Sequence, residues 1–203
     1  MEFSVDLFVE RSAQNLAAEM GRQGFKGLVL GASGGIDCLV TMALCVRARK
    51  RSDKWPVVAF QINDSRVKGE FYNPEIYKYL GADLIQTDIT TDAIDMEKRL
   101  GMPPRWLTVW LMNLVLRWVP MKAKRQVILA IKAGKVPDCV LVYYHLLTLL
   151  HLLRIAKLRE YATRHGLMLV ICVNMTEASL GYFVEQGVDD PHMGDCASLS
   201  GLY

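Results

Sequence analysis

The chain has 203 residues, of which 52% are hydrophobic, and its formal net charge is +3. This length is enough for one domain with a sizeable core, and the high apolar fraction indicates a further surface buried between copies of the chain. The weak positive charge suits an anionic nucleotide as ligand but does not require nucleic acid as a partner.

Five cysteines are spread along the chain: Cys38, Cys45, Cys139, Cys172 and Cys196. Their number is odd, and they form no Cys-x-x-Cys pair or close cluster, which argues against a zinc ribbon and against an iron–sulfur site. The acidic, mixed N-terminus does not have the pattern of a signal peptide. We therefore expect free thiols in a reducing, cytoplasmic location.

The first half of the chain alternates helix and strand patterns. Apolar residues recur at helical spacing from about 6 to 21, and Gly21 and Gly24 are expected to end that helix. The elements expected next are a strand at about 27–31, a helix at about 36–49, a strand at 57–62, a helix at about 73–80 and a strand at 83–88. This order predicts the α/β class, with a doubly wound parallel sheet and right-handed crossovers.

The turn between the first strand and its helix reads Gly31-Ala32-Ser33-Gly34-Gly35-Ile36-Asp37-Cys38. Two consecutive glycines let the backbone turn tightly and bring N–H groups close to a bound anion. The helix that follows adds the positive end of its dipole, and Ser33 adds a hydroxyl. Asp37 suits a phosphate site only with a cation between them, which indicates Mg²⁺. The spacing matches neither a Walker loop nor a Rossmann fingerprint.

The stretch from about 102 to 150 has a different character. An apolar helix is expected between Pro103 and Pro120, a basic one at about 121–133 and a third, apolar run at 139–153. The first is too short for a membrane span, and the third holds two histidines and continues into basic residues. Helices that are apolar all round need cover on every side, so we expect core packing and a homodimer. The sequence thus predicts one domain, 1–203, with a helical insertion at about 102–150.

Several polar residues leave two interpretations open. Asn113, inside the first apolar helix, either faces a substrate or, as we favour, makes a hydrogen bond between helices. His145 and His151 are expected to be core or interface histidines rather than ligands. Residues 63–65 follow the strand at 57–62, where open α/β sheets bind ligands, but they also suit a plain turn. A last strand is expected at 167–172, ending on Cys172.

The octet resembles the Ser-Gly-Gly-x-Asp-Ser loop of the N-type ATP pyrophosphatases, with Cys38 in place of the final Ser. That family includes NAD synthetase, GMP synthetase, asparagine synthetase, tRNA-thiolating enzymes and stand-alone members such as the sulfurtransferase that makes 6-thioguanine. A second stretch, 174–195, resembles NAD synthetase through Asn174, Glu177, Leu180–Phe183 and the pair Gly194-Asp195. Ile171-Cys172-Val173 departs from the Gly-Thr-Gly of that enzyme. The dinucleotide-binding half of NAD synthetase is largely missing.

The resemblance implies an adenine nucleotide alpha-hydrolase type of Rossmann-like fold and a set of roles. ATP would lie across the carboxyl end of the sheet, with adenine against the end of the second strand and pyrophosphate on the loop. Asp37 and Glu177 would hold Mg²⁺. The residues expected to bind ATP are Gly31, Ser33, Gly34, Gly35, Ile62, Arg154 and Thr176, and those expected to contact the substrate are Asn113, Phe183 and Asp195.

The reaction implied is adenylation of a small-molecule carbonyl, with release of pyrophosphate and then of AMP. Our first hypothesis is sulfur transfer to a nucleobase such as guanine, with Asp37, Cys38 and Cys172 catalytic and a sulfur-donor protein as partner. The second is amidation with ammonia, as in NAD synthetase. A third, a non-enzymatic nucleotide sensor, explains less, because mere binding would not need both Asp37 and Glu177. We expect neither nucleic acid nor a membrane as partner.

Overall fold

The computed structural model describes residues 4–52, 55–66, 75–103, 138–172 and 196–198, together with the single residues 107, 110, 117 and 135. The chain divides into two compact units. The first comprises Met1–Ile89 and His151–Tyr203, and the second comprises Thr90–Leu150. The helical insertion expected at about 102–150 falls within the second unit, and the sheet belongs to the first.

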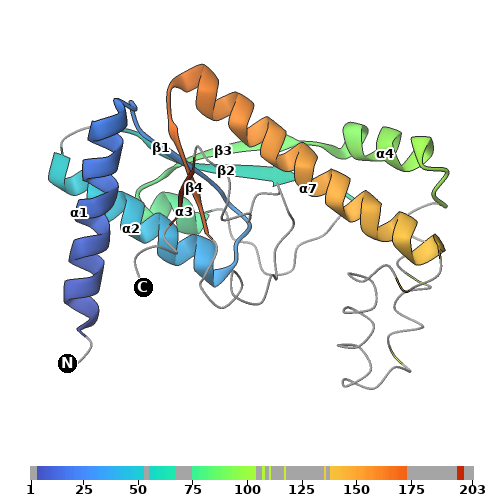
Figure 1. Ribbon diagram of the computed structural model, residues 1–203, viewed down its shortest axis with the longest axis horizontal. Helices are drawn as coiled ribbons and strands as arrows, with labels where there is room; N and C mark the ends of the chain where they lie inside the picture. The colour runs from blue at the N-terminus through green and yellow to red at the C-terminus, as the bar shows by residue number, and fades with distance from the viewer. Residues whose placement is uncertain are drawn as a thin grey trace. The chain divides into compact units, whose positions relative to one another are not determined.

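The first unit contains a parallel sheet in the order β3-β2-β1-β4-β5 (Figure 1). Its strands are β1 (Leu28–Gly31), β2 (Val57–Asn63), β3 (Asp83–Asp88), β4 (Met168–Ile171) and β5 (Cys196–Ser198). In register, Leu28 pairs with Val57 on one side and with Met168 on the other. The order runs outward from β1 in both directions, which confirms the doubly wound α/β fold.

The helices α1, α2, α3 and α7 follow expected apolar patterns with shifted ends, whereas α4 was not predicted. They are α1 (Val5–Gln23), α2 (Ile36–Ser52), α3 (Glu75–Leu80), α4 (Thr90–Arg99) and α7 (Asp138–His165). The prediction that Gly21 ends the first helix was wrong. Gly21 lies inside α1, and Gly24 alone caps it in the left-handed conformation, with φ of 72°. The apolar run expected at 139–153 is the first half of α7, which continues to His165.

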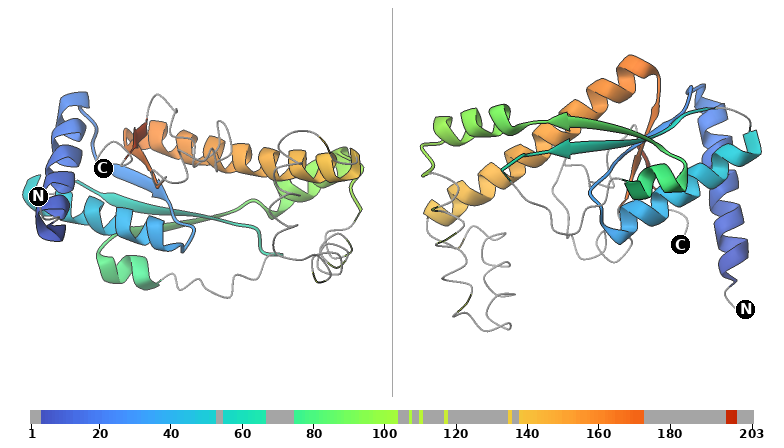
Figure 2. Two further views of the ribbon diagram at one scale, coloured as in Figure 1. Left: turned by 60° about the horizontal axis from the view of Figure 1, so that its bottom comes forward. Right: turned by 180° about the vertical axis from the view of Figure 1, so that it is seen from behind.

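The strands β1, β2 and β4 are buried on both faces. One set of side chains, including Leu28, Leu30 and Val57, packs with α1 and α2. The alternate set, including Val29 and Val58, packs against the part of α7 that belongs to this unit. Figure 2 shows α1 and α2 on one side of the sheet and this part of α7 on the other. Two-sided burial is typical of a parallel sheet, and it leaves only the strand ends for polar function.

The described part of the second unit has a small core of its own. Ala93, Leu146 and Leu150 pack together with Met96 and Met102. Trp110 has 58% of its surface exposed, whereas Trp106, Asn113 and Trp118 lie outside the described residues, as does most of the expected helix pair at 103–133. The homodimer therefore stays a prediction. Among the helices that the structure describes, none is long and apolar enough to cross a membrane.

Gly27 marks the closest backbone approach at the start of the sheet. A Cβ atom on this residue would lie 2.5 Å from the carbonyl oxygen of Pro56. That oxygen accepts a hydrogen bond of 2.9 Å from the N–H of Leu28. The absence of a side chain at position 27 thus allows β1 and β2 to begin side by side.

We predict opposite effects of alanine at two glycines. Gly27→Ala should lower the free energy of unfolding by about 1–3 kcal/mol, because the added methyl group overlaps rigid backbone. Gly21→Ala is the matched control: it lies within α1 with nothing near its Cβ position, so it should stabilise by about 0.5–1 kcal/mol. Urea denaturation measures both, and equal stability of the two variants would contradict the close approach at Gly27.

Candidate functional site

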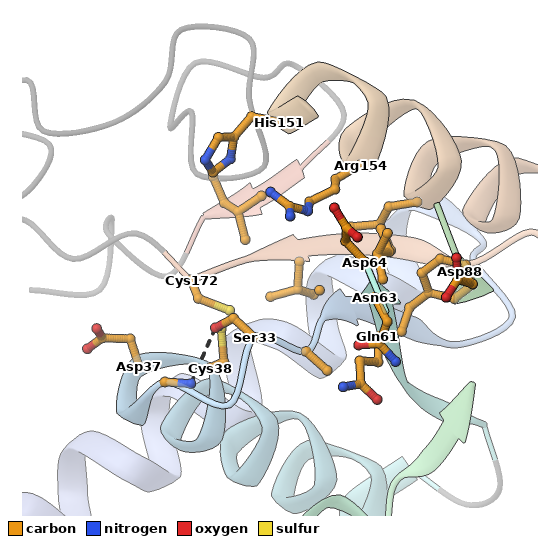
Figure 3. A pocket seen from close by; sticks show the side chains of 18 of the residues that line it. Ser33, Asp37, Cys38, Gln61, Asn63, Asp64, Asp88, His151, Arg154 and Cys172 are labelled. Carbon is orange, nitrogen blue, oxygen red and sulfur yellow. Dashed lines mark hydrogen bonds between the residues drawn. The ribbon is translucent and has the colours of Figure 1, made fainter. Parts of the chain in front are cut away.

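A pocket of about 720 Å³ opens at the carboxyl edge of the sheet, within the first unit. Its wall combines the turn after β1, the ends of β2, β3 and β4, and one face of α7 (Figure 3). A cavity of this size accommodates a nucleotide-sized ligand. The wall residues are Gly31, Ala32, Ser33, Gly35, Asp37, Cys38, Phe60, Gln61, Ile62, Asn63, Asp64, Ser65, Asp88, His151, Arg154, Leu158, Val170, Ile171 and Cys172.

The turn between β1 and α2 is held by its own side chains. The N–H of Gly35 donates to Ser33 Oγ at 3.3 Å, and Ser33 Oγ lies 3.1 Å from Cys38 Sγ. The N–H of Ala32 extends the sheet ladder by donating to the carbonyl of Phe60 at 2.9 Å. The strand, glycine turn and helix predicted for a phosphate cradle are therefore present, with the N-terminus of α2 at the pocket.

Gly34 has a structural role in the turn. Its φ of 83° is a conformation that glycine adopts without strain. Its N–H donates to Tyr77 Oη at 3.0 Å, and Gly34 is not part of the pocket wall. Tyr77 lies on α3 and is fully buried beneath the turn. In this structure that donor holds the turn to α3, and the expected contact of Gly34 with ATP stays a prediction.

Asp37 stands in the first turn of α2, exposed on the pocket wall. A carboxylate at this end of a helix is favoured by the dipole. Within the part of the chain that the structure describes, no group of three or more His, Cys, Asp or Glu side chains is arranged to hold a metal ion. Asp37 fits Mg²⁺ in the way common at phosphate sites, where one or two carboxylates and the ligand's own phosphates share the ion. Glu177, the second expected ligand, lies outside the described residues.

Two thiols meet beside the turn. Cys38 and Cys172 both line the pocket, and Figure 3 shows their side chains converging next to Ser33. A hydrogen bond from Cys172 is the main cause that lowers the pKa of Cys38 to about 6. Burial alone would raise this pKa, and a hydrogen bond with Ser33 lowers it further. The hydrogen bond to Cys38, together with burial, raises the pKa of Cys172 well above its ordinary value. The pair is thus polarised, with Cys38 as thiolate and Cys172 as donor.

The residues after β2 form a turn and a pocket wall at once. Asp64 accepts hydrogen bonds from the backbone N–H of Arg66 at 3.1 Å and from its guanidinium at 2.9 and 2.8 Å. The Asp64 side chain is 2% exposed. Its charge is therefore matched locally, as a buried carboxylate requires. Asn63, Asp64 and Ser65 also line the pocket, so the turn is observed and ligand binding by these residues stays a prediction.

The helix α7 supplies basic groups to the same wall. Arg154, expected to bind ATP, lines the pocket, and so does His151, one turn earlier on α7. The assignment of His151 to a core or interface was thus incomplete, since the residue faces the cavity (Figure 3). Its spacing of three residues from Arg154 places both on one helix face, and this signal could have identified it.

The sequence-predicted site residues divide into two groups. The structure brings together on one wall Gly31, Ser33, Gly35, Asp37, Cys38, Ile62, Arg154 and Cys172. Asn113, Thr176, Glu177, Phe183 and Asp195 lie outside the described residues. The sequence did not indicate Gln61 and Asp88, which come to the wall because β2 and β3 end at the same edge.

Comparison with protein families finds one match, to the family described as NAD synthase, over residues 8–100. The matched segment is less than half of the chain and contains the whole turn at 31–38. A comparison with curated protein sequences finds no match. The similarity to the NAD synthase family therefore extends from α1 to α4 of this chain.

Several solved structures resemble the whole chain. The NMN synthetase of Francisella tularensis has a TM-score of 0.61 and 17% identity, with 92% of this chain covering 62% of that protein. The NH3-dependent NAD synthetase of Campylobacter jejuni has a TM-score of 0.64 and 16% identity, and the match covers 92% of this chain and 64% of that protein. The NAD+ synthetase of Burkholderia pseudomallei has a TM-score of 0.62 and 18% identity, and the match covers 92% of this chain and 60% of that protein. At such identities the likeness establishes the fold, and the chain spans less than two thirds of the length of each of these proteins.

The hydrogen bond from Gly34 to Tyr77 gives a prediction about the turn. Tyr77→Phe removes the hydroxyl that accepts from Gly34, so exchange of the Gly34 amide hydrogen should become roughly tenfold faster and stability should fall by about 0.5–1.5 kcal/mol. Tyr79→Phe is the matched control on the same helix, because Tyr79 is 89% exposed. Amide exchange by NMR measures the effect. An unchanged Gly34 exchange rate in Tyr77→Phe would show that the phenol does not hold the turn.

The polarised thiols give a pH prediction. Because the Cys38 pKa is lowered, its thiolate should form as the pH rises through about 6, and alkylation by iodoacetamide should follow that curve. Cys172→Ser keeps a hydrogen-bond donor, so the pH midpoint of Cys38 alkylation should stay low. Cys172→Ala removes the donor, so this midpoint should move to higher pH. Cys45, whose pKa burial raises to about 12, should not react in the folded protein. Peptide-resolved mass spectrometry reads each site, and equal midpoints in the Ser and Ala variants would contradict the proposed donor.

Proposed function

We propose that this protein binds ATP in the pocket and splits it into AMP and pyrophosphate while it activates a small-molecule carboxylate. The observation that carries the proposal is the position of the turn 31–38. It lies inside the segment similar to the NAD synthase family, and it opens onto a cavity of about 720 Å³ at the carboxyl edge of the sheet. Ligands of open α/β sheets bind at this edge.

The wall residues fit the parts of ATP. The N-terminus of α2, the Ser33 hydroxyl and the Gly35 backbone would receive the phosphates. The backbone near Ile62 at the end of β2 would face adenine, and the Arg154 guanidinium would contact the phosphate chain. Asp37, with Glu177 beyond the described residues, would hold Mg²⁺. When bound, that ion would neutralise phosphate charge and make pyrophosphate a better leaving group.

The proposed chemistry proceeds in two displacements. A carboxylate oxygen of the substrate attacks the α-phosphorus, and pyrophosphate leaves with the electron pair of the broken P–O bond. Ammonia then attacks the adenylated carbon, loses a proton, and displaces AMP to give an amide. The chain's contribution is to position the phosphates and to match their charge. The names of the similar structures, NAD and NMN synthetases, support a pyridine nucleotide carboxylate as substrate.

Sulfur transfer is the second candidate. The comparisons favour amidation, and the one observation in favour of sulfur transfer is the pair Cys38 and Cys172 in the pocket. A thiol that carries sulfur as a persulfide would have to lie beside the adenylated carbon. Under this alternative a sulfur donor replaces ammonia, and a purine such as guanine replaces the carboxylate.

The deciding experiment scores products from labelled ATP and Mg²⁺. With ammonium and the carboxylate forms of the pyridine mononucleotide and dinucleotide, we expect AMP, pyrophosphate and a carboxamide product. With guanine and a low-molecular-weight persulfide as the sulfur donor we expect no AMP. Formation of ADP in place of AMP would overturn the proposed function, and a thiolated product that is lost in both Cys38→Ser and Cys172→Ser would establish the sulfur alternative.

A substitution at Asp37 tests the same reaction. Asp37→Asn should lower AMP formation by about 100-fold or more, equivalent to roughly 2.7 kcal/mol or more in barrier, while the fold is retained. Asp6→Asn is the control, because Asp6 is also exposed in the first turn of a helix but lies on α1, away from the pocket wall. Equal rates in the two variants would exclude Asp37 from the reaction.

A further inference from the structure

The two pocket thiols are in contact with each other. Cys38 projects from the first turn of α2, and Cys172 comes directly after β4, so they belong to different elements of the first unit. Both side chains line the same pocket and pack against the same core cluster. Figure 3 shows them side by side at the edge of the cavity. The fold therefore brings two sulfurs together at a ligand-accessible surface.

Access distinguishes these thiols from a third one nearby. Cys38 and Cys172 are partly exposed and line the pocket, whereas Cys45, two turns further along α2, is 0% exposed. All three are free thiols. A small reagent that enters the cavity thus reaches the first two and not the third.

We propose that Cys38 and Cys172 form a dithiol modification site that a low-molecular-weight disulfide converts into an intramolecular disulfide. The Cys38 sulfur attacks one sulfur of the reagent, and the reagent's S–S bond breaks to release one thiolate. Cys172 then loses its proton and attacks the Cys38 sulfur, which releases the second half of the reagent as thiolate. The two protein sulfurs are oxidised by two electrons in total, and the reagent is reduced to two thiols.

The location couples this modification to the pocket. Cys38 is adjacent to Asp37, and its sulfur lies 3.1 Å from Ser33 Oγ. A group attached to Cys38 would fill the mouth of the turn, where the proposed function places the phosphates. Bound ATP and the attacking reagent therefore exclude each other, and this consequence rests on the proposed function, whereas the dithiol itself does not.

Glutathione disulfide is the probe, used on the full chain without nucleotide. The wild type should lose two hydrogen atoms in intact mass, and peptide mapping should find Cys38 joined to Cys172. Cys172→Ser should stop at the mixed disulfide on Cys38, because the resolving thiol is gone, and Cys38→Ser should form neither product. Cys45→Ser is the control and should behave as the wild type. Reduction with dithiothreitol should restore the original mass.

The outcomes separate the two proposals. No cross-link, or one that joins Cys139 or Cys196 in place of this pair, would overturn the dithiol site whatever ATP does. ATP with Mg²⁺ at ten times its Kd should slow the cross-link roughly tenfold, since only the free fraction reacts. Calorimetry measures ATP binding separately. A cross-link with no ATP binding would leave the dithiol site standing and remove the proposed function, and ATP binding without protection would overturn the mutual exclusion.

Discussion

Burial of the parallel strands on both faces is the constraint on which the site depends. Alternate residues of β1, β2 and β4 pack against α1 and α2 on one side and against α7 on the other. No polar ligand group can stand along such strands without a large desolvation cost. Polar and charged groups therefore collect where the strands end, and the carboxyl ends of β1, β2, β3 and β4 all line one pocket. The strand order runs outward from β1 in both directions, so the connections diverge there and leave the edge open.

The turn at this edge is shaped before any ligand arrives. Three of its N–H groups donate hydrogen bonds within the protein. The N–H of Ala32 donates to a carbonyl of β2, that of Gly34 donates to Tyr77, and that of Gly35 donates to Ser33. These partners come from the sheet, from α3 and from the turn itself, so the turn's conformation is determined from three directions. Such pre-organisation lowers the entropy that binding must otherwise cost. It also means that glycine at 34 serves the backbone path, since its donor is used by the fold.

Local sequence patterns predicted most of the fold, but they could not predict contacts between residues far apart in the sequence. Apolar runs and glycines identify β1 to β4 and α1 to α3, because these patterns are set by neighbours in the sequence, whereas β5 was not predicted. The same patterns identify the turn and Asp37. Tyr77 could not be found in this way, because it is one apolar residue of a short helix, 43 residues from its partner. The position of His151 at the pocket was not predicted, because its helix is apolar on most sides; only its spacing of three residues from Arg154 indicates the shared helix face.

Cys38 shows how one substitution changes the physics of the turn. The resemblance to ATP pyrophosphatases places serine at this position, and a serine hydroxyl stays neutral beside a phosphate. A thiol with a lowered pKa carries negative charge at the same point, which opposes an anionic ligand by Coulomb repulsion. The hydrogen bond from Cys172 draws that charge toward β4 and away from the turn. A cation on Asp37 would oppose it from the other side. Cys172 thus belongs with Cys38 as one electrostatic unit: an apolar residue at 172 would remove the donor that lowers the Cys38 pKa, and serine at 38 would carry no charge for the thiol at 172 to stabilise.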